Sequence, residues 1–347
     1  CRKIMKRVCV IGHFAKGKEL LNGQTVKTKI VAKEIIKTLG KNEVSCMDTC
    51  GGIRALRYVP RQCINALKHH KNVIIMPAEN GLRVFAPILV VLNTFFYRKL
   101  HYVVIGGWIS QFLQKKKVLS FFLKKFDALY VETDSMKIAL QKEGFNNIIV
   151  VPNCKELIIL KPEELVYENS EPFKLCTFSR VMKEKGIEIA VNAVKRINAA
   201  ENREIFTLDI YGQIDDNQID WFNSLQKSFP KYIQYKGRVS FDKSTEVLKQ
   251  YYALVFPTFY EGEGFAGTLI DAMAAGVPVI ASDWKYNSEI IQDGTTGMII
   301  KNNLQDSLYE IKENVDLWKR MKRNCLDAAS HYLPSKALEP LITNMMK

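Results

Sequence analysis

The sequence predicts an α/β protein of two domains, each built on a doubly wound, Rossmann-like parallel sheet. Short apolar runs alternate with helical patterns over residues 7–152, and the same alternation starts again at residue 173. This alternation favours parallel strands, because successive parallel strands need a crossover that a helix usually supplies. A chain of 347 residues is long enough for two domains that each bury a core.

In the N-terminal half, apolar and β-branched runs predict a first series of strands with helices between them. A polar loop over residues 12–24 follows the first strand, and a helix is expected to begin near Thr25. Residues 111–125 mix aromatic side chains with lysines over about four turns of a predicted surface helix. The strands are expected near residues 7–12, 43–48, 72–76, 101–105, 127–132 and 148–151.

A less regular stretch that contains Pro162 and Pro172 separates this series from the next. We therefore place an N-terminal domain at residues 1–155 and a C-terminal domain at residues 156–334, followed by a terminal helical segment at residues 335–347. Ligands of open sheets bind beyond the carboxyl ends of the strands, so a cleft between two facing domains is the expected site. The second series of strands is expected near residues 173–179, 205–211, 232–236, 253–257 and 277–281.

The composition is typical of a folded protein, with 47% apolar and 25% charged residues. The longest apolar run, residues 84–97, is interrupted by Pro87 and Asn93 and is shorter than the roughly 20 residues that span a bilayer. The apolar run at residues 8–11 is too short for the core of a signal peptide. We therefore expect no transmembrane helix and a cytoplasmic location.

The eight cysteines are scattered and include no CxxC pair, which favours reduced thiols. Cys9 and Cys176 fall inside predicted core strands. Cys46 and Cys50 lie close together, but no further His or Cys pair nearby completes the four ligands of a zinc site. We expect no bound metal.

Charge is unevenly distributed along the chain. Residues 1–153 contain 26 Lys and Arg against 9 Asp and Glu, a net charge of +17, whereas residues 154–347 contain 24 against 27, a net charge of −3. Such one-sided charge indicates an acidic partner of the first half, which could be an anionic membrane, a phosphate-bearing acceptor or a nucleic acid.

Residues 260–280 place a carboxylate, a glycine-rich turn, a helix start and a buried strand in one unbroken run. Gly264 and Gly267 let the backbone approach a ligand, because glycine has no Cβ. A helix is expected to start near Thr268, and the first amides of a helix have no intrahelical partner. Residues 266–269 are therefore predicted to bind an anion such as diphosphate.

Two carboxylates flank this predicted anion site. Glu263 lies in the loop before the helix, and Asp271 is expected in the first helical turn. A carboxylate there is favoured by the helix dipole and can accept hydrogen bonds from sugar hydroxyls. The alternative is an ordinary strand, turn and helix in which Glu263 is solvated and Asp271 is a helix-start charge.

Two cations follow the first strand of the second series. Arg180 comes directly after the strand, and Lys185 precedes a helix whose apolar positions follow helical spacing. A cation at a helix N-terminus opposes the helix dipole unless a negative group binds nearby, so Arg180 and Lys185 together indicate a diphosphate clamp. The alternative is a pair of solvated surface cations.

Residues 260–280, with Arg180 and Lys185, resemble the donor site of retaining GT-B glycosyltransferases, most closely glycosyltransferase family 4 among the glycosyl transferases of group 1. The resemblance implies that Glu263 lies beside the transferred hexose and that Asp271 binds the ribose hydroxyls. Asp271 is one methylene shorter than the glutamate usual in the family. Arg180 and Lys185 are implied to neutralise the leaving diphosphate, and the last helix to return to the first domain. The remaining donor-binding residues of this run are Gly264, Phe265, Ala266, Gly267, Thr268 and Leu269.

Shorter matches follow in the order of the family, at residues 151–153, 211–213 and 236–239. They imply that the loop at Gly212 passes near the diphosphate and that the backbone around Val239, which follows Arg238, contacts the nucleotide base. Residues 287–291 and 293–297 also match the family, and we interpret them as turns of the fold.

In the first domain, residues 22–25 resemble the glycine-rich loop that reaches towards phosphate and acceptor in this family. The alternative is a flexible surface loop in which Asn22 or Thr25 caps the following helix. Residues 105–108 occupy a place where many family members carry a histidine, which this chain lacks there, and His13 and His101 are the nearest candidates for that role. The tentative acceptor and phosphate residues are therefore Gly23, Gln24, Thr25, His13 and Trp108.

The resemblance thus implies a retaining hexosyltransferase that uses a nucleotide sugar, UDP-linked, and we expect a glycan acceptor on a lipid carrier. Residues 267–271 and 284–289 are most similar to enzymes of capsule or exopolysaccharide assembly. No Asp-x-Asp motif occurs, so metal-independent transfer without a cofactor is expected. The basic first half and the lysine-rich stretch at residues 111–125 favour peripheral contact with the inner face of the plasma membrane, and no nucleic acid is expected. The alternative for residues 111–125 is an apolar stripe that packs on the sheet, with its lysines solvated.

Two alternatives remain open at this point. A sugar-nucleotide epimerase of the same fold would release an epimerised sugar without any acceptor. A basic module with an inactive site, which binds membrane or nucleic acid, would be insensitive to substitution of Glu263 or Lys185 and sensitive to salt.

Overall fold

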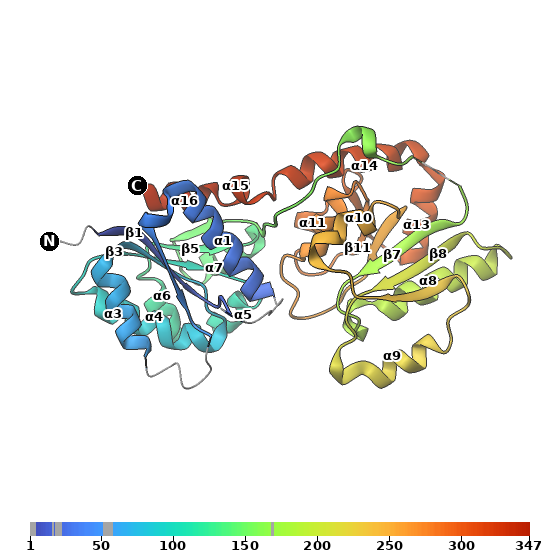
Figure 1. The fold of residues 1–347 in the computed structure, drawn as a ribbon. Coiled ribbons are helices and arrows are strands. Elements are labelled where there is room, and N and C mark those ends of the chain that lie inside the picture. The colour runs from blue at the N-terminus through green and yellow to red at the C-terminus, as the bar shows by residue number, and fades with distance from the viewer. Residues whose placement is uncertain (1–4, 16, 18–22, 51–57, 168–169) are drawn as a thin grey trace. The chain divides into compact units, whose positions relative to one another are not determined.

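The computed structural model describes residues 5–15, 17, 23–50, 58–167 and 170–347 of the chain (Figure 1). It contains two compact units, the first formed by Cys1–Glu156 with Pro334–Lys347 and the second by Leu157–Leu333. Each unit has one six-stranded sheet, and the named strands of both sheets pair in parallel. The predicted pair of doubly wound parallel sheets is therefore confirmed.

The sheet of the N-terminal unit has the order β2-β1-β3-β4-β5-β6. Helices cover both of its faces, with α1 and α16 on one side and α3 and α4 on the other (Figure 1). Its strands are β1 (Lys6–Gly12), β2 (Val44–Asp48), β3 (His70–Ile75), β4 (Lys99–Val103), β5 (Ala128–Val131) and β6 (Ile148–Val150). Its helices are α1 (Gly23–Leu39), α3 (Val59–His69), α4 (Glu79–Asn93), α5 (Ile109–Gln114), α6 (Lys117–Leu123), α7 (Asp134–Lys142), α15 (Pro334–Ala337) and α16 (Glu339–Met346), with a short 3-10 helix at Lys41–Glu43.

The sheet of the C-terminal unit has the order β12-β11-β10-β7-β8-β9. Its strands are β7 (Phe173–Phe178), β8 (Phe206–Tyr211), β9 (Ile233–Gly237), β10 (Ala253–Phe256), β11 (Val279–Ser282) and β12 (Gly297–Ile300). Its helices are α8 (Ile187–Ala200), α9 (Ile219–Gln226), α10 (Ser244–Leu248), α11 (Gly267–Ala274), α12 (Asn287–Ile290), α13 (Leu304–Glu313) and α14 (Val315–Ser330). Short 3-10 helices lie at Pro162–Glu164, Lys183–Lys185, Asp216–Gln218 and Phe241–Lys243.

Strand β12 was not predicted. Residues 293–297 were interpreted only as a turn, yet Gly297 begins a strand that pairs in parallel with β11. A Cβ on Gly297 would lie 2.1 Å from the carbonyl oxygen of Val279. Glycine therefore permits the close strand contact here, and the glycine that signalled a turn is the first residue of an edge strand.

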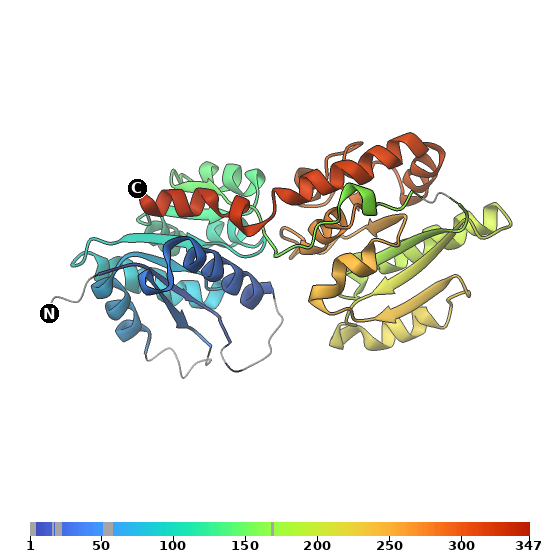
Figure 2. The ribbon, with the colours of Figure 1, turned by 45° about the horizontal axis from the view of Figure 1, so that its top comes forward.

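The terminal segment packs on the N-terminal unit, as Figures 1 and 2 show. Leu338, Leu341 and Met345 are buried in the same core as residues of β1 and β5. The single helix expected at residues 335–346 is instead divided into α15 and α16. Pro340 explains the division, because it sits in the first turn of α16 and could not continue a helix from α15 without losing a backbone hydrogen bond.

The surface helix expected at residues 111–125 is also divided, into α5 and α6. Lys116 between them has a non-helical backbone, with φ −131° and ψ 63°. The hydroxyl of Ser120 donates to the carbonyl oxygens of Leu113 and Lys116, each at 3.2 Å, and so links α6 to the end of α5. Within the described part of the chain, none of the helices has the length and hydrophobicity that a bilayer-spanning segment needs.

Candidate active site

The loops after β7 and β10 meet at the carboxyl-terminal edge of the C-terminal sheet. These strands are neighbours, but the chain leaves them towards opposite edges of the sheet. Such a switch point is where open α/β sheets bind ligands. Gly186 permits the contact between the loops, since its φ is +72° and a Cβ there would lie 2.0 Å from the carbonyl oxygen of Pro257. No residue other than glycine fits this position without moving the loops.

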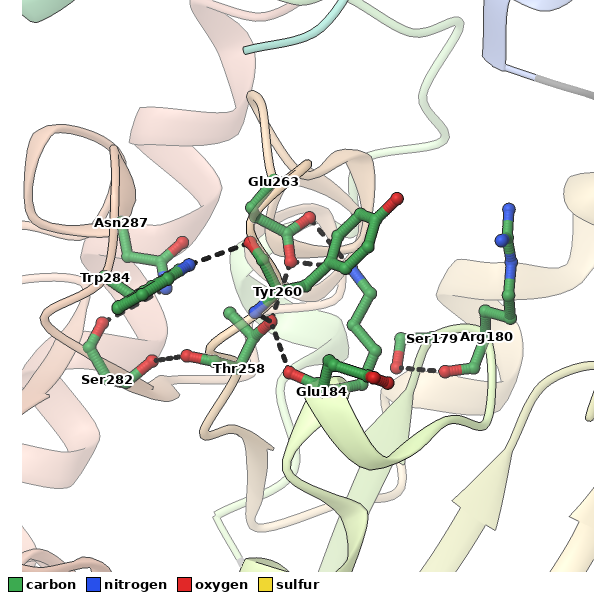
Figure 3. Close-up of polar contacts among 10 residues, drawn as sticks. Ser179, Arg180, Glu184, Thr258, Tyr260, Glu263, Ser282, Trp284 and Asn287 are labelled. Atoms are coloured by element: carbon green, nitrogen blue, oxygen red, sulfur yellow. Dashed lines mark hydrogen bonds and ion pairs between the residues drawn. The ribbon is translucent and has the colours of Figure 1, made fainter. Parts of the chain in front are cut away.

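Lys185 and Glu263 form a buried ion pair between the two loops. The Nζ of Lys185 lies 2.8 Å from Oε1 and 2.6 Å from Oε2 of Glu263. The hydroxyl of Thr258 donates a further hydrogen bond to Oε2 at 2.9 Å (Figure 3). The side chains of Lys185 and Glu263 are only 12% and 7% exposed. Charge-assisted hydrogen bonds that water does not reach are strong, so the carboxylate is held in one orientation.

Hydrogen bonds to the backbone fix the loop that carries Glu263 (Figure 3). The hydroxyl of Ser282 donates to the carbonyl oxygen of Thr258 at 2.5 Å, and the indole of Trp284 donates to that of Tyr260 at 2.8 Å. The ring of Tyr260 covers Lys185, whose Nζ lies 5.2 Å from the ring centroid. Sequence reasoning missed these supporting residues, although a polar side chain at the end of a buried strand was the available signal for Thr258 and Ser282.

Arg180 lies at the same edge of the sheet but outside this pair. Its Nη1 is 3.4 Å from Oδ2 of Asp215, and its side chain is 60% exposed. Among the described residues, no hydrogen bond or ion pair joins Arg180 to Glu263. An exposed ion pair contributes little to stability, so Arg180 can turn towards a ligand at small cost. The two cations predicted as one clamp thus occupy different environments.

Helix α11 begins four residues after Glu263, at Gly267. The amide of Leu269 donates to the carbonyl oxygen of Ala266 at 3.1 Å. In the described part of the chain, no hydrogen bond is found for the amides of Ala266, Gly267 and Thr268. The hydroxyl oxygen of Thr268 is buried and also has no partner. A helix start with unpaired amides is suited to an anion.

Two predicted donor residues face inward. Asp271 is the fifth residue of α11 and is 5% exposed, so its predicted place in the first helical turn is wrong. The helix begins at Gly267, one residue earlier than expected, which moves Asp271 into the second turn. Phe265 packs edge-on against Tyr332, with ring centroids 5.3 Å apart, and contributes to the core.

The loop after β8 approaches the loop after β7 so closely that it requires glycine. Gly212 has a φ of +140°, and a Cβ there would lie 1.7 Å from the carbonyl oxygen of Ser179. The hydroxyl of Tyr235 donates to the carbonyl oxygen of Gly212 at 2.8 Å and fixes this loop. The predicted donor residues that follow β9 are Arg238, which is exposed, and Val239, which is half-buried against the core.

In the N-terminal unit, the predicted glycine-rich loop is partly helical. Gly23, Gln24 and Thr25 form the first turn of α1, so the loop prediction is wrong for them. Asn22 lies outside the described residues. Thr25 is fully buried, and its Oγ1 lies 2.7 Å from Nδ1 of His13. This contact joins the end of β1 to the start of α1.

Trp108 and His101 make their contacts within the fold. The indole of Trp108 donates to the carbonyl oxygen of Ile105 at 2.8 Å. His101 is fully buried, with ring nitrogens 3.1 Å from the hydroxyl of Tyr130 and 3.0 Å from Oδ1 of Asn72. Burial lowers the pKa of His101 to about 4, so the ring is neutral at neutral pH. His101 is therefore a core residue of β4.

Sequence reasoning missed a second lysine–glutamate pair, which lies in the N-terminal unit. Lys27 of α1 and Glu132, directly after β5, form an ion pair whose side chains are 4% and 3% exposed. The Nζ of Lys27 also donates to the carbonyl oxygen of Val104 at 3.4 Å. The two residues are 105 positions apart, and no local pattern links them.

Within the described residues, no group of three or more His, Cys, Asp or Glu side chains could hold a metal ion. The described cysteines are free thiols. Burial raises the pKa of the Cys9 thiol to about 12, so Cys9 stays protonated and unreactive.

Residues 172–313 match the protein family described as Glycosyl transferases group 1. The matched segment runs from the start of β7 to the end of α13. It therefore contains Arg180, Lys185 and Glu263.

Curated relatives match part of the chain. The UDP-N-acetylglucosamine–peptide N-acetylglucosaminyltransferase GtfA subunit of Streptococcus pneumoniae serotype 4 is 30% identical over 192 residues, which cover 54% of this chain and 37% of that protein. An uncharacterized 41.2 kDa protein in the cps region of Klebsiella pneumoniae is 26% identical over 195 residues, which cover 56% of this chain and 49% of that protein. The chain thus spans half, or less, of the length of these relatives.

A solved structure of similar fold covers nearly the whole chain. The structure of Anabaena Alr3699/HepE in complex with UDP and glucose matches 98% of this chain and 99% of that chain, with a TM-score of 0.71 and 14% sequence identity. At this identity the likeness concerns the fold. The shared fold is the GT-B fold that the sequence predicted.

Proposed function

We propose that this chain, whose residues 172–313 match the Glycosyl transferases group 1 family, moves a hexose from a UDP-sugar to a glycan acceptor. We further propose that the configuration at the sugar carbon is retained and that no metal ion takes part. The observation that carries the proposal is the buried Lys185–Glu263 pair. Glu263 stands four residues before α11, and the first amides of this helix have no described partner.

The transfer breaks the bond between the anomeric carbon and the diphosphate oxygen, and the bonding electrons leave with the diphosphate. A bond forms from the acceptor hydroxyl oxygen to the same carbon, and the hydroxyl proton is released. Negative charge therefore develops on the diphosphate. Lys185, Arg180 and the first amides of α11 are the groups that would stabilise it, because preorganised positive groups act most strongly where charge develops.

Glu263 has a different role in this proposal. Its carboxylate is oriented by Thr258 and Lys185 and would lie beside the hexose, where it can accept hydrogen bonds from sugar hydroxyls. A fixed carboxylate also favours the positive charge that develops on the sugar ring as the leaving group departs. Asp271 lies one helical turn beyond the start of α11 and would bind the ribose hydroxyls.

We propose UDP as the nucleotide because of what similar proteins bind. The Anabaena structure is a complex with UDP and glucose, and the pneumococcal relative is named for UDP-N-acetylglucosamine. The loops at Gly212 and at residues 238–239 lie at the carboxyl-terminal strand edge where the base and diphosphate would bind.

We propose an acceptor carried on a lipid, in the synthesis of a bacterial surface polysaccharide, and contact of the N-terminal unit with an anionic membrane. The net charge of +17 over residues 1–153 supports this. Val118 and Phe121 of α6 are exposed and lie among lysines 115–117 and 124–125. Apolar side chains next to lysines favour the interface of an anionic bilayer, although the short helix α6, and not one long helix, presents them here.

Thermal denaturation with nucleotides tests the proposed donor site. UDP should raise the melting temperature without added metal, since a ligand at about 100 times its Kd stabilises a fold by about 2.7 kcal/mol. The Lys185→Met variant should lose most of this response, whereas Lys227→Met, which removes an exposed lysine of the same unit, should keep it. A response to no nucleoside diphosphate, or an equal response in both variants, would contradict the proposal.

A further inference from the structure

A cavity opens at the amino-terminal edge of the C-terminal sheet, where β7 and β10 begin. Its volume is about 320 Å³. The active-site loops follow the other ends of the same two strands, so the cavity is separate from the candidate active site. The lining residues used below are Lys174, Lys249, Tyr252, Trp318 and Lys322.

Lys322 of α14 is the unusual residue of this cavity. It is 1% exposed, and among the described residues it forms no ion pair with an acid. Its described charge contact is the ring of Trp318, whose centroid lies 5.0 Å from Nζ. A buried ammonium without a counterion is destabilising, so the described contacts of Lys322 do not account for its burial.

The aromatic wall that holds Lys322 is rigid. The indole of Trp318 donates to the carbonyl oxygen of Tyr252 at 3.0 Å. The rings of Trp318 and Tyr252 stack at 4.7 Å with an angle of 17° between their planes. Lys322 therefore lies against a surface that is already fixed before any ligand binds, which lowers the entropic cost of binding.

Two further lysines give the cavity an excess of positive charge. Lys174, the second residue of β7, is exposed and has no ion pair among the described residues. Among the described residues, Lys249 has an ion pair with Glu246 alone, at 2.8 Å and partly exposed. The acid that lines the cavity, Glu171, is already paired with Arg203. Surface pairs contribute little, so Lys249 is available to a ligand.

We propose that this cavity binds a small phosphate-bearing anion, with Lys322 as its buried contact and Lys174 and Lys249 at its rim. A counterion in the cavity would pair the one buried lysine whose charge the described fold leaves without an acid. The volume lies at the lower end of the range for small-molecule sites, so a phosphate group on a molecule of monosaccharide size fits better than a nucleotide.

Burial lowers the pKa of Lys322 to about 8. The ammonium is therefore still largely protonated at neutral pH. An anion bound in the cavity would raise the pKa again, because a nearby negative charge favours the protonated form. The site is independent of the proposed transferase activity, because it shares no residue with the donor site.

Inorganic phosphate is the probe for this proposal, titrated by calorimetry and thermal denaturation against sodium chloride at equal ionic strength. Phosphate should bind the wild-type protein and raise its melting temperature. Lys174→Met with Lys249→Met should weaken phosphate binding at least about tenfold, because each lysine contributes a charge-assisted contact to the anion. Both lysines are at the surface, so the double variant is expected to fold.

Three control variants make the result decisive. Lys227→Met with Lys231→Met removes two exposed lysines away from the cavity and should leave phosphate binding unchanged. Arg180→Met should also leave phosphate binding unchanged, since weaker binding by this variant would mean that phosphate binds at the donor site. Lys322→Met should abolish binding in a protein that is at least as stable as the wild type.

The proposal is overturned if phosphate has no effect beyond that of chloride. It is equally overturned if Lys322→Met binds phosphate like the wild type, or if both lysine pairs weaken binding to the same extent. A protein that responds to phosphate through this cavity but to no nucleoside diphosphate would refute the proposed function and leave this inference standing.

Discussion

Each unit contains a buried lysine–glutamate pair at the carboxyl-terminal edge of its sheet, and the surroundings of the two pairs differ. In the N-terminal unit, Lys27 and Glu132 are 4% and 3% exposed, and Lys27 adds a bond to the carbonyl oxygen of Val104. In the C-terminal unit, Lys185 and Glu263 are 12% and 7% exposed. Burial of an ion pair is therefore common to both units and does not by itself identify an active site.

A buried hydroxyl without a described partner lies near each pair, Thr28 beside Lys27 and Thr268 near Glu263. What separates the two pairs is the helix start that follows each glutamate, because the hydroxyl of Thr133 caps α7 after Glu132, whereas α11 after Glu263 has no side-chain cap. Close to Glu263 in the chain, the amides of Ala266, Gly267 and Thr268 have no described hydrogen bond, and the buried hydroxyl of Thr268 lacks a partner. A buried polar group without a partner is costly, and a bound diphosphate would satisfy these groups together. We therefore propose a structural role for the Lys27–Glu132 pair and a catalytic role for the Lys185–Glu263 pair.

The largest expected effect separates the two glutamates by activity. Glu263→Gln should lower kcat by a factor of about 10²–10⁴, the range for a positioned catalytic carboxylate, because the amide keeps the size but loses the charge. Glu132→Gln should change kcat by much less and lower the stability more, since Lys27 is left almost without access to water. Initial rates with the accepted UDP-sugar, together with urea unfolding of both variants, measure the two effects.

An equal loss of kcat in the two variants would remove the distinction between the pairs. So would a Glu263→Gln protein with wild-type rates. Circular dichroism of both variants controls for misfolding, because a variant that has lost helix signal cannot be compared by rate.

A double substitution sharpens the comparison through stability. Lys27→Met alone should destabilise the N-terminal unit by about 3–5 kcal/mol, because it removes the positive charge that pairs with the buried Glu132. Lys27→Met with Glu132→Leu should recover much of this loss, since replacing both charges by apolar groups is often neutral. Trp108 is the one tryptophan of residues 1–156 and 334–347, so its fluorescence reports unfolding of this unit.

The same double replacement in the C-terminal unit should restore stability but not activity. Lys185→Met with Glu263→Leu removes both members of the proposed catalytic pair, so no rate should return. Recovery of transferase activity in that variant would show that the pair only supports the fold.

The two pairs also show what a sequence can reveal. Glu263 and Lys185 were found because each stands in a local pattern, a glycine-rich turn before a helix and a strand before a helix. Lys27 and Glu132 are 105 residues apart and were missed, because only the strand order brings them together. Thr258 and Ser282, which fix the loop around Glu263, were also missed, although each is a polar side chain at the end of a buried strand.

The errors in the predicted elements have local causes that are visible afterwards. Strand β12 was missed because its first residue, Gly297, was taken as part of a turn. Pro340 and the Lys115–Lys116 step each divide a predicted helix. The strands other than β12 were predicted well, because buried parallel strands are nearly continuous apolar runs.

Lys322 extends the comparison to a buried lysine that has no glutamate. Burial lowers its pKa from 10.5 to about 8, so the folded state disfavours the protonated form. The resulting stability is fully present above pH 10.5 and is lost as the pH falls towards 8, a loss of about 3 kcal/mol for a shift of this size. Lys322→Met should lack this loss and should therefore gain stability over the wild type as the pH is lowered.

The measurement is the difference in unfolding free energy between Lys322→Met and the wild type at pH 10 and at pH 7, without phosphate. The difference should grow by about 2.5 kcal/mol in favour of the variant at pH 7, because part of the loss has already occurred at pH 10. Cys325 on the same helix does not titrate in this window, because burial raises its pKa to about 12, and Lys174 and Lys249 are present in both proteins. A difference that does not change with pH would mean that an acidic group of the protein pairs with Lys322 in solution, as Glu132 pairs with Lys27.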